Sequence, residues 1–197
     1  MFKHLFNLYL INKLKNQKIM ATTATKWAVD PMHSEVQFKV KHLVISTVSG
    51  FFKSFEGSVE TESEDFENAQ VAFSLDVNSI DTNQEQRDTH LKSADFFDAE
   101  KYPKITFKST SFTKNGDDYE LKGDLTIKDI TKPITLAVEY GGSAGDFYGN
   151  TKAGFEITGK VNRKEFGLTW DGITEAGSIV VGEDIKLNIN VQFTKQA

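Results

Sequence analysis

Two short segments of this 197-residue sequence hold most of the side chains that could do chemistry. In the first, Asp30, His33 and Ser34 supply the three residue types of a hydrolase triad. Triads are recognised by geometry and not by chain order, and the sequence has no G-x-S-x-G nucleophile elbow. We therefore expect Asp30 and Ser34 to form turn hydrogen bonds at the start of a strand. A hydrolase or an isomerase stays as the less favoured alternative.

The second segment contains Arg87, Asp88 and His90, and Arg163 lies in a later turn. One interpretation is a buried Arg–Asp pair that fixes how a helix docks, since most charged pairs are structural. The other is a polar cluster at the mouth of a pocket, where it would receive a ligand headgroup. The structural role is favoured, and the headgroup role stays open.

Metal and thiol chemistry are disfavoured by the remaining residue types. None of His4, His33, His42 and His90 has the H-x-x-H or H-E-x-x-H spacing of a zinc site. The sequence has no cysteine, which excludes a disulfide framework, a zinc ribbon and a thiol nucleophile. We expect no metal site, and histidines that are hydrogen-bonded to neighbouring groups.

Charge and hydropathy narrow the class further. The formal net charge is −5 and the isoelectric point is about 5.4, the wrong sign for a protein that grips a phosphate backbone. No run approaches the ~18 apolar residues of a membrane-spanning helix. We expect one globular domain, because barrels of this length commonly stay undivided.

The elements that must position these residues are strands, since apolar and polar residues alternate with a period of two through most of the chain. Such alternation is typical of antiparallel strands with one buried face. The clearest alternating runs are 35–41, 71–77, 104–108, 124–128, 134–138, 154–158 and 184–194. Together with the segments 51–60 and 119–122, they predict eight to ten strands.

Turn chemistry separates these runs, and one segment interrupts them. Asn115-Gly116 predicts a hairpin, and the glycines of 141–146 predict a loop. Thr82 with Glu85 three residues later is a capping-box signature, so we expect a short helix to begin there within 82–98. Leu91, Phe96 and Phe97 would then pack on the end or side of a barrel. The pattern favours a closed barrel slightly over a two-sheet sandwich.

The first nineteen residues differ from the rest, because they carry four lysines and no acid. A secretory signal needs a longer apolar segment and a small-residue cleavage site. We interpret 1–25 as an extension outside the domain, with Met20 as the working start. A basic interfacial helix is the second interpretation, and a cleaved signal the last.

Phenylalanine is unusually common, with 16 residues, and several lie on the apolar phase of the predicted strands. Phe38, Phe73, Phe107, Phe155 and Phe193 are examples. In a sealed small barrel they are simply core. In an open one they line a pocket for a long apolar chain. The sequence alone leaves both possibilities.

At the level of motifs, the chain from about Lys26 to its C-terminus resembles the YceI-like lipid/polyisoprenoid-binding family. The individual motifs are short, and their order along the chain is specific. They are Trp27-x-x-Asp30-Pro-x-His33-Ser34, Phe38-x-Val40-x-His42, Gly50-x-Phe52, Ser79-Ile-Asp-Thr82, Arg87-Asp88-x-His90-Leu91-Lys92-Ser93, Asp95-Phe96-Phe97-Asp98, Tyr102-Pro103-x-Ile105-x-Phe107-x-Ser109, Gly123-Asp124-Leu125-Thr126, Thr131-Lys132 and Asn162-Arg163-x-x-Phe166-Gly167.

The resemblance implies an all-β fold, a lipocalin-like extended antiparallel β-barrel of about eight strands with one short helix, spanning 26–197. It implies non-enzymatic binding, carriage or storage of a long-chain isoprenoid or similar amphiphile in the lumen, and often a homodimer. His33, His90 and Arg163 match motif positions and are candidates for the headgroup or rim. The lumen candidates, from strand phase and resemblance together, are Phe38, Val40, Phe52, Phe73, Leu75, Phe107, Phe155, Ile157, Leu187 and Ile189.

Several further expectations follow from this resemblance. No cofactor is expected beyond a bound isoprenoid lipid or quinone, and no nucleic acid. Many members are exported with a clear signal peptide, and 1–19 is a poor one, so we expect a cytoplasmic protein, with the periplasm as the alternative. An acidic body favours only transient membrane contact. The principal alternative function is a structural or stress-related barrel filled by its own side chains.

Overall fold

The computed structural model describes residues 24–172 and 180–197, and this part of the chain is mostly strand. It has eleven strands in one sheet, a helix α2 (Glu85–Lys92) and three short 3-10 turns, η1 (Pro31–His33), η2 (Val77–Ser79) and η3 (Arg163–Phe166). The strands are β1 (Thr25–Val29), β2 (Glu35–His42), β3 (Ser46–Phe52), β4 (Phe55–Thr61), β5 (Gln70–Asp76), β6 (Ile80–Asp81), β7 (Lys104–Asn115), β8 (Asp118–Ile127), β9 (Ile130–Gly145), β10 (Thr151–Asn162) and β11 (Val181–Lys195).

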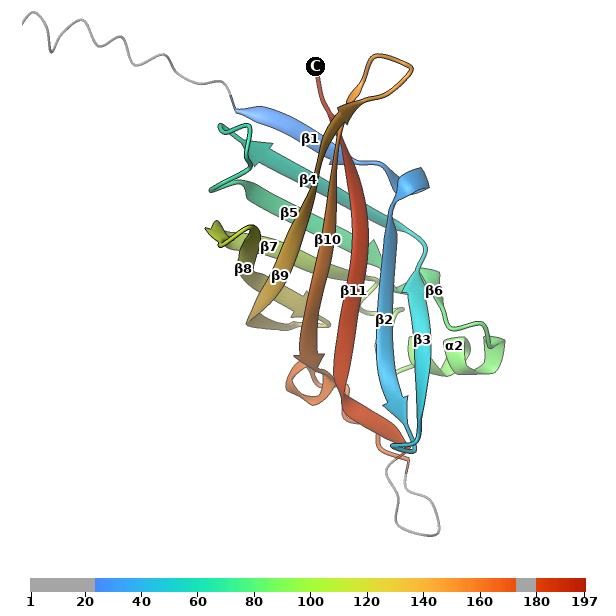
Figure 1. Cartoon of the computed structure of the whole chain (residues 1–197). Helices are drawn as coiled ribbons and strands as arrows, with labels where there is room; N and C mark the ends of the chain where they lie inside the picture. The colour runs from blue at the N-terminus through green and yellow to red at the C-terminus, as the bar shows by residue number, and fades with distance from the viewer. Residues whose placement is uncertain (1–23, 173–179) are drawn as a thin grey trace, which may run out of the picture.

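Eight of these strands close into a barrel. The ring runs β1-β4-β5-β7-β8-β9-β10-β11, and β1 completes it by pairing with both β4 and β11. β11 is long enough to serve two partners, since Phe193 pairs with Val29 of β1 while Leu187 pairs with Phe38 of β2. β2, β3 and β6 therefore extend the wall beyond the ring (Figure 1). The prediction of an antiparallel barrel of about eight strands is confirmed, and the sandwich is excluded by closure.

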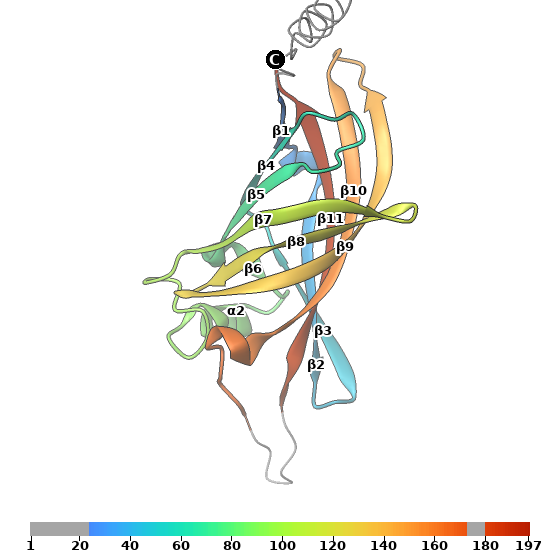
Figure 2. The same ribbon diagram turned by 90° about the vertical axis from the view of Figure 1, so that its left-hand side faces the viewer.

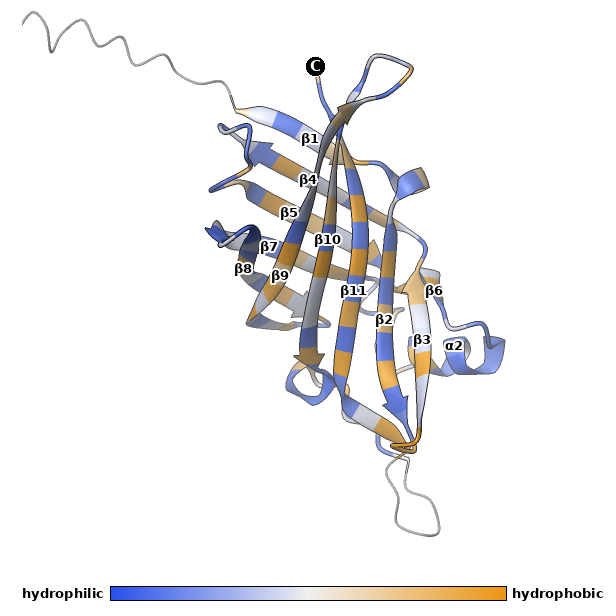
Figure 3. Cartoon of the chain, viewed as in Figure 1, coloured by the Kyte–Doolittle hydropathy of each residue, from blue (hydrophilic) through white to orange (hydrophobic). Residues whose placement is uncertain are grey.

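The strands have two orientations in the barrel. Figure 1 shows β9, β10, β11, β2 and β3 as long neighbouring strands, with β1, β4, β5, β7 and β8 crossing behind them. The view turned by 90° shows the same curvature and the β9–β10 hairpin that projects at one end (Figure 2). Residue hydropathy alternates along β11 and β2, as the period of two predicts (Figure 3). Each strand thus turns one apolar face inward.

Two local predictions were wrong. The glycines of 141–146 are mostly strand and not loop, because β9 continues to Gly145 and its backbone pairs with β10, as Gly142 does with Gly154. A register shift at Gly154 and Phe155 accommodates the curvature of this hairpin. The turn itself is at Asp146, whose carboxylate accepts hydrogen bonds from the backbone N–H groups of Tyr148 and Asn150.

The helix also begins later than the capping box predicted. Its N-cap is Gln84, whose side-chain oxygen accepts from the backbone N–H of Arg87. Thr82, which directly follows β6, instead binds two side chains of the helix. Its hydroxyl donates to the Asp88 carboxylate at 2.5 Å and accepts from Nε of Arg87 at 2.7 Å. Other local hydrogen bonds, to residues five and six positions along the chain, therefore replace the capping-box pattern at Thr82. As expected, Leu91 and Phe97 pack against the barrel core.

Within the described residues, no helix has the length and apolar character needed to cross a membrane.

The interior side chains form two hydrophobic clusters. One contains Trp27, Phe66, Phe112, Tyr119 and Phe155 among its buried members. The other is built around residues such as Val36, Phe52, Leu75, Ile105 and Phe166. Partly buried side chains that touch both clusters lie between them: they are Val29, Phe73, Phe107, Ile134, Leu187 and Ile189. Partial burial at the centre of a barrel indicates interior space that side chains do not fill.

Candidate ligand-binding cavity

That space is a cavity of about 610 Å³ inside the barrel. Its volume is within the ~300–1,000 Å³ typical of small-molecule sites. Its wall is formed by apolar side chains from nearly every strand of the ring and from β2 and β3. The structure places all ten sequence-predicted lumen residues in this wall: Phe38, Val40, Phe52, Phe73, Leu75, Phe107, Phe155, Ile157, Leu187 and Ile189.

Glycines on neighbouring strands hold three of these phenylalanine rings against the wall. A Cβ at Gly50 would overlap Cζ of Phe38, and a Cβ at Gly57 would lie 2.6 Å from Cδ2 of Phe73. The register pairs these residues directly across β2–β3 and β4–β5. Each ring thus occupies the space that a side chain on the facing strand would take.

A related arrangement occurs on β7 and β8, where Gly123 lies diagonally across from Phe107 and a Cβ at Gly123 would overlap its Cζ. A ring that occupies the space over a glycine takes up less of the lumen. The openness of the cavity therefore depends on which residue faces each phenylalanine.

One end of the cavity is closed by aromatic side chains. Phe66 is 1% exposed and packs against Trp27 and Phe155, with ring centroids 5.1 Å away in both cases. Phe112 stacks on Tyr119 at 4.9 Å. Tyr119 is also fixed by its hydroxyl, which donates to the backbone carbonyl of Asp65 at 2.5 Å. This end presents a rigid, apolar floor.

The other end has a polar rim. Most polar side chains of the cavity wall lie at the end of β2, in the segment around α2, or on η3, and the exceptions are Gln37 and Thr106. The rim residues are Lys41, His42, Thr82, Gln84, Gln86, Arg87, His90 and Arg163. Sequence reasoning left Lys41, His42, Thr82, Gln84 and Gln86 out of the site, and it considered Arg87 for a pocket mouth only as the less favoured interpretation. The polar face of the expected helix was the signal that could have found Gln84 and Gln86.

Direct contacts join the elements of this rim. The ring of Trp170 lies 5.0 Å from that of His90 and 5.3 Å from that of Phe96, which ties the segment after η3 to the helix region. On the other side, the backbone N–H of Leu43 donates to the carbonyl of Val180 at 3.0 Å. Val180 and Trp170 both line the cavity.

Arg163 holds the rim together and is 3% exposed. Its five N–H groups match five acceptors, which is the full capacity of a guanidinium. The acceptors are the carbonyls of Leu168, Trp170, Val181 and Gly182 and the carboxylate of Asp171.

An Arg–Asp pair is present, but not at the positions that the sequence favoured, and only its arginine is buried. Arg163 pairs with Asp171 at 2.6 Å, and both lie outside the helix. Hydrogen bonds of Arg87 and Asp88 to Thr82 fix the helix instead. Because its donors are all engaged by the protein, Arg163 is positioned to shape the rim and has no N–H left for a headgroup.

The other two headgroup candidates have different positions. His90 lines the cavity, and its Nε2 is 3.0 Å from Oδ2 of Asp95. His33 is on η1, is exposed, and is not among the residues of the cavity wall. Its Nδ1 lies 3.0 Å from Oδ2 of Asp30. The two histidines do not converge on one cleft.

The cluster around Asp30 has the geometry of a turn and an ion pair. The Asp30 carboxylate accepts from the backbone N–H of Met32 and from Nζ of Lys152 at 2.9 Å, and the hydrogen bond from Lys152 lowers its pKa to about 2. Ser34 Oγ donates to the Asp30 carbonyl at 2.7 Å and so does not face His33. The expected turn bonds are confirmed, and these residues do not form a Ser–His–Asp relay.

In the described part of the chain, no three or more His, Asp or Glu side chains gather in a way that could hold a metal ion.

Comparisons with known proteins agree with this architecture. The model of the YceI-like domain matches residues 27–193. A UPF0312 protein of Staphylococcus aureus (strain N315) is 37% identical over 171 residues, which cover 86% of this chain and 98% of the relative. The YCEI protein of Campylobacter jejuni has a solved structure that matches with a TM-score of 0.67 and 32% identity, over 80% of this chain and 90% of that one.

A more distant structure shares the fold alone. It is a polyisoprenoid binding domain from Saccharophagus degradans, with a TM-score of 0.60 and 12% identity over 86% of this chain and 98% of that one. The family match covers the closed ring, the helix and the rim. The chain belongs to the YceI-like family.

Proposed function

We propose that the protein binds a long-chain isoprenoid or a similar amphiphile in its lumen, and carries or stores it without chemical change. The observation that carries this proposal is the cavity, with an aromatic floor at one end and a polar rim at the other. An amphiphile has a matching arrangement, because it has an apolar chain and one polar end.

Transfer energy supports a chain in this position. Each methylene moved from water into an apolar lumen contributes about 0.8 kcal/mol. A chain of several isoprene units would therefore gain enough to offset the cost of immobilising it. The similar fold of the polyisoprenoid binding domain from Saccharophagus degradans supports the same ligand class.

The rim offers groups for the polar end of such a ligand. Two nitrogens of Arg87 are held by Thr82, and Nη1 has no protein acceptor among residues 24–172 and 180–197. Arg87 lines the cavity together with Gln84, Gln86 and His90. We propose that Arg87 and His90 face the headgroup, while Arg163 maintains the rim. The lumen contacts are the ten wall residues named above.

The alternatives predict different cavities. A barrel filled by its own side chains would leave little room for a ligand, which disagrees with about 610 Å³ of interior space. A hydrolase or isomerase would need Asp30, His33 and His90 to converge, and only His90 lines the cavity. Binding without catalysis is therefore the function that the geometry supports best.

Native mass spectrometry of gently purified protein tests the proposal. We expect a discrete apolar adduct on the 22.1 kDa chain, which organic extraction then identifies as an isoprenoid lipid or quinone. The measurement is repeated after incubation with isoprenoid quinones. A clean ligand-free mass in both cases would refute lumen binding.

We also propose that the protein forms a homodimer and that it is cytoplasmic. Light scattering coupled to gel filtration tests the dimer, and a monomer mass across the concentration range would contradict it. Cell fractionation with N-terminal sequencing tests the location. Recovery in the periplasm with a start beyond Met20 would favour the periplasmic alternative.

A further inference from the structure

The turn between β2 and β3 carries an exposed apolar tip. Val44 is 74% exposed and Ile45 is 86% exposed. Leu43 and Val44 have φ values of +50° and +65°. A hairpin turn with this backbone favours Asn and Gly, and positive φ is especially unfavourable for a β-branched residue such as Val44. The residues at this tip therefore suit neither solvent exposure nor the turn.

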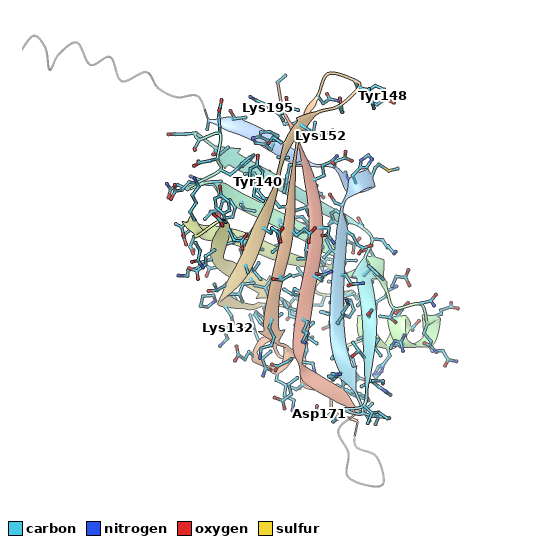
Figure 4. The ribbon with its side chains drawn as sticks, viewed as in Figure 1. Lys132, Tyr140, Tyr148, Lys152, Asp171 and Lys195 are labelled. Atoms are coloured by element: carbon cyan, nitrogen blue, oxygen red, sulfur yellow. The ribbon has the colours of Figure 1, made fainter. Side chains whose placement is uncertain are left out.

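This tip, Val44 and Ile45, lies at the rim of the cavity. The preceding residue Leu43 donates its backbone N–H to Val180, which lines the cavity, and His42 lines it too. Asp171 and the β2–β3 turn are at the same end of the molecule, and Tyr148 is at the opposite end (Figure 4). An apolar chain that enters or leaves the lumen at the rim would pass close to the tip.

The surface behind the tip is basic. Lys41 is exposed near the end of β2, three residues before Val44. Further back, Lys186 pairs in register with Lys39 on one side and with Lys160 on the other. Like charges directly opposite each other destabilise a sheet, so this row has no stabilising role.

The nearby carboxylates do not neutralise this surface. Asp184 is paired with Lys160 at 3.1 Å, and Glu183 with Lys164 at 2.9 Å. Lys39, Lys41 and Lys186 have no ion-pair partner among the residues that the structure describes. The acidic protein thus has a locally cationic end.

We propose that the tip and these lysines dock the rim on an anionic lipid bilayer, so that the cargo is exchanged between bilayer and lumen. Val44 and Ile45 enter the acyl region while Lys41 meets anionic headgroups. Two side chains on a tight turn are far less than the ~800 Å² per partner of a stable protein interface, which favours a fluid bilayer over a second copy of the chain. The exchange step rests on the proposed function, whereas docking itself needs no cargo.

Vesicle flotation tests the docking directly. The vesicles contain phosphatidylcholine alone or with about 30% phosphatidylglycerol, at low and high salt. The variant combines Val44→Asn with Ile45→Ser, because Asn tolerates positive φ and the turn is retained. The control combines Phe147→Ser with Tyr148→Ser, which removes the exposed aromatic pair at the opposite end.

We expect the wild type and the control to float with the anionic vesicles, and salt to weaken this binding. The tip variant should bind at least about tenfold more weakly. Equal flotation of the tip variant and the wild type, or loss of flotation in the control alone, would overturn the proposal. So would a concentration-dependent dimer that the tip variant abolishes, with no vesicle binding by the wild type.

A second measurement separates this proposal from the proposed function. A fluorescent farnesol analogue is offered either from dilute solution or from donor vesicles. Exchange at the tip is supported if the wild type and the tip variant both take up the analogue from solution, and transfer from vesicles is about tenfold slower in the tip variant. Uptake from neither source, together with tip-dependent flotation, would refute lumen binding and still support docking.

Discussion

Gly57→Ala tests whether the ring of Phe73 is held out of an open lumen. The new Cβ would lie 2.6 Å from Cδ2 and 2.9 Å from Cε2 of Phe73, where ordinary contacts are 3.4–4 Å. The ring must therefore move by about 1 Å, which restores normal van der Waals separation. On its other side it borders the cavity, so the free direction is into the lumen.

The expected effect on stability is small. Replacing Gly by Ala in a strand reduces the entropy of the unfolded chain, which stabilises by about 0.4–1 kcal/mol. A displaced ring costs about 0.5–1.5 kcal/mol if it leaves its rotamer minimum. The free energy of unfolding should thus change by less than about 1 kcal/mol.

The expected effect on binding is larger. A ring shifted into the lumen takes the space of one or two methylene groups of the chain, each worth about 0.8 kcal/mol. Affinity for an isoprenoid should fall about fourfold to fifteenfold. Fluorescence titration with a farnesol analogue measures the affinity, and urea unfolding measures the stability.

Two further variants make the result specific. Gly154→Ala is the matched control, because a Cβ there has nothing within 4 Å. It should leave the affinity unchanged and raise the free energy of unfolding by about 0.4–1 kcal/mol through the unfolded chain alone. Phe73→Leu in the Gly57→Ala background should restore part of the affinity, which a double-mutant cycle quantifies. Unchanged affinity with unfolding destabilised by more than about 3 kcal/mol would refute the reasoning, since Phe73 would then belong to a filled core.

Three other predictions follow from the same structure. Ile157→Phe should fill part of the cavity and weaken probe binding, while the free energy of unfolding stays the same or rises by about 0.5–1 kcal/mol. A fall of about 1–3 kcal/mol in the free energy of unfolding would indicate a lumen that is already filled. Arg163→Met should destabilise the protein by about 3–5 kcal/mol and lower Tm by roughly 6–20 °C in calorimetry, and the more exposed Asp171→Asn should do much less; equal effects would contradict the five-bond role of the arginine. Lys152 holds the pKa of Asp30 at about 2, below its usual 3.8. The interaction between Asp30 and Lys152 therefore contributes to stability above pH ~4, and this contribution is lost as the pH falls through about 2. Urea unfolding should show Lys152→Met about 1–2 kcal/mol less stable at neutral pH with the gap closing near pH 2, and a gap independent of pH would refute the assignment.

Local sequence pattern determined much of this protein. The alternation of Val36, Phe38 and Val40 assigns their faces without any tertiary information, because successive side chains in a strand point to opposite sides. The same rule on β10 and β11 correctly selected Ile157, Leu187 and Ile189 for the interior. The turn at Asp30 was also predictable, since Asx and Ser turns form within a few residues.

Contacts between distant segments decided the rest. Closure depends on β1 meeting β11, as when Val29 pairs with Phe193, and alternation carries no information about which strands are neighbours. The acceptors of Arg163 were set in part in the same way, since Val181 and Gly182 come from the far side of the rim. The helix start was instead set by hydrogen bonds of Thr82 to residues five and six positions along the chain, which replaced the capping box.

Whether the lumen is open is the clearest case of this division. The sequence determined that Phe38, Phe73 and Phe107 face inward, but an inward ring can fill a barrel or line its wall. The register decided the outcome by placing Gly50 and Gly57 opposite two of these rings. A ring that lies over glycine takes up less of the lumen, so the cavity depends on which residues the strand pairing brings opposite each other.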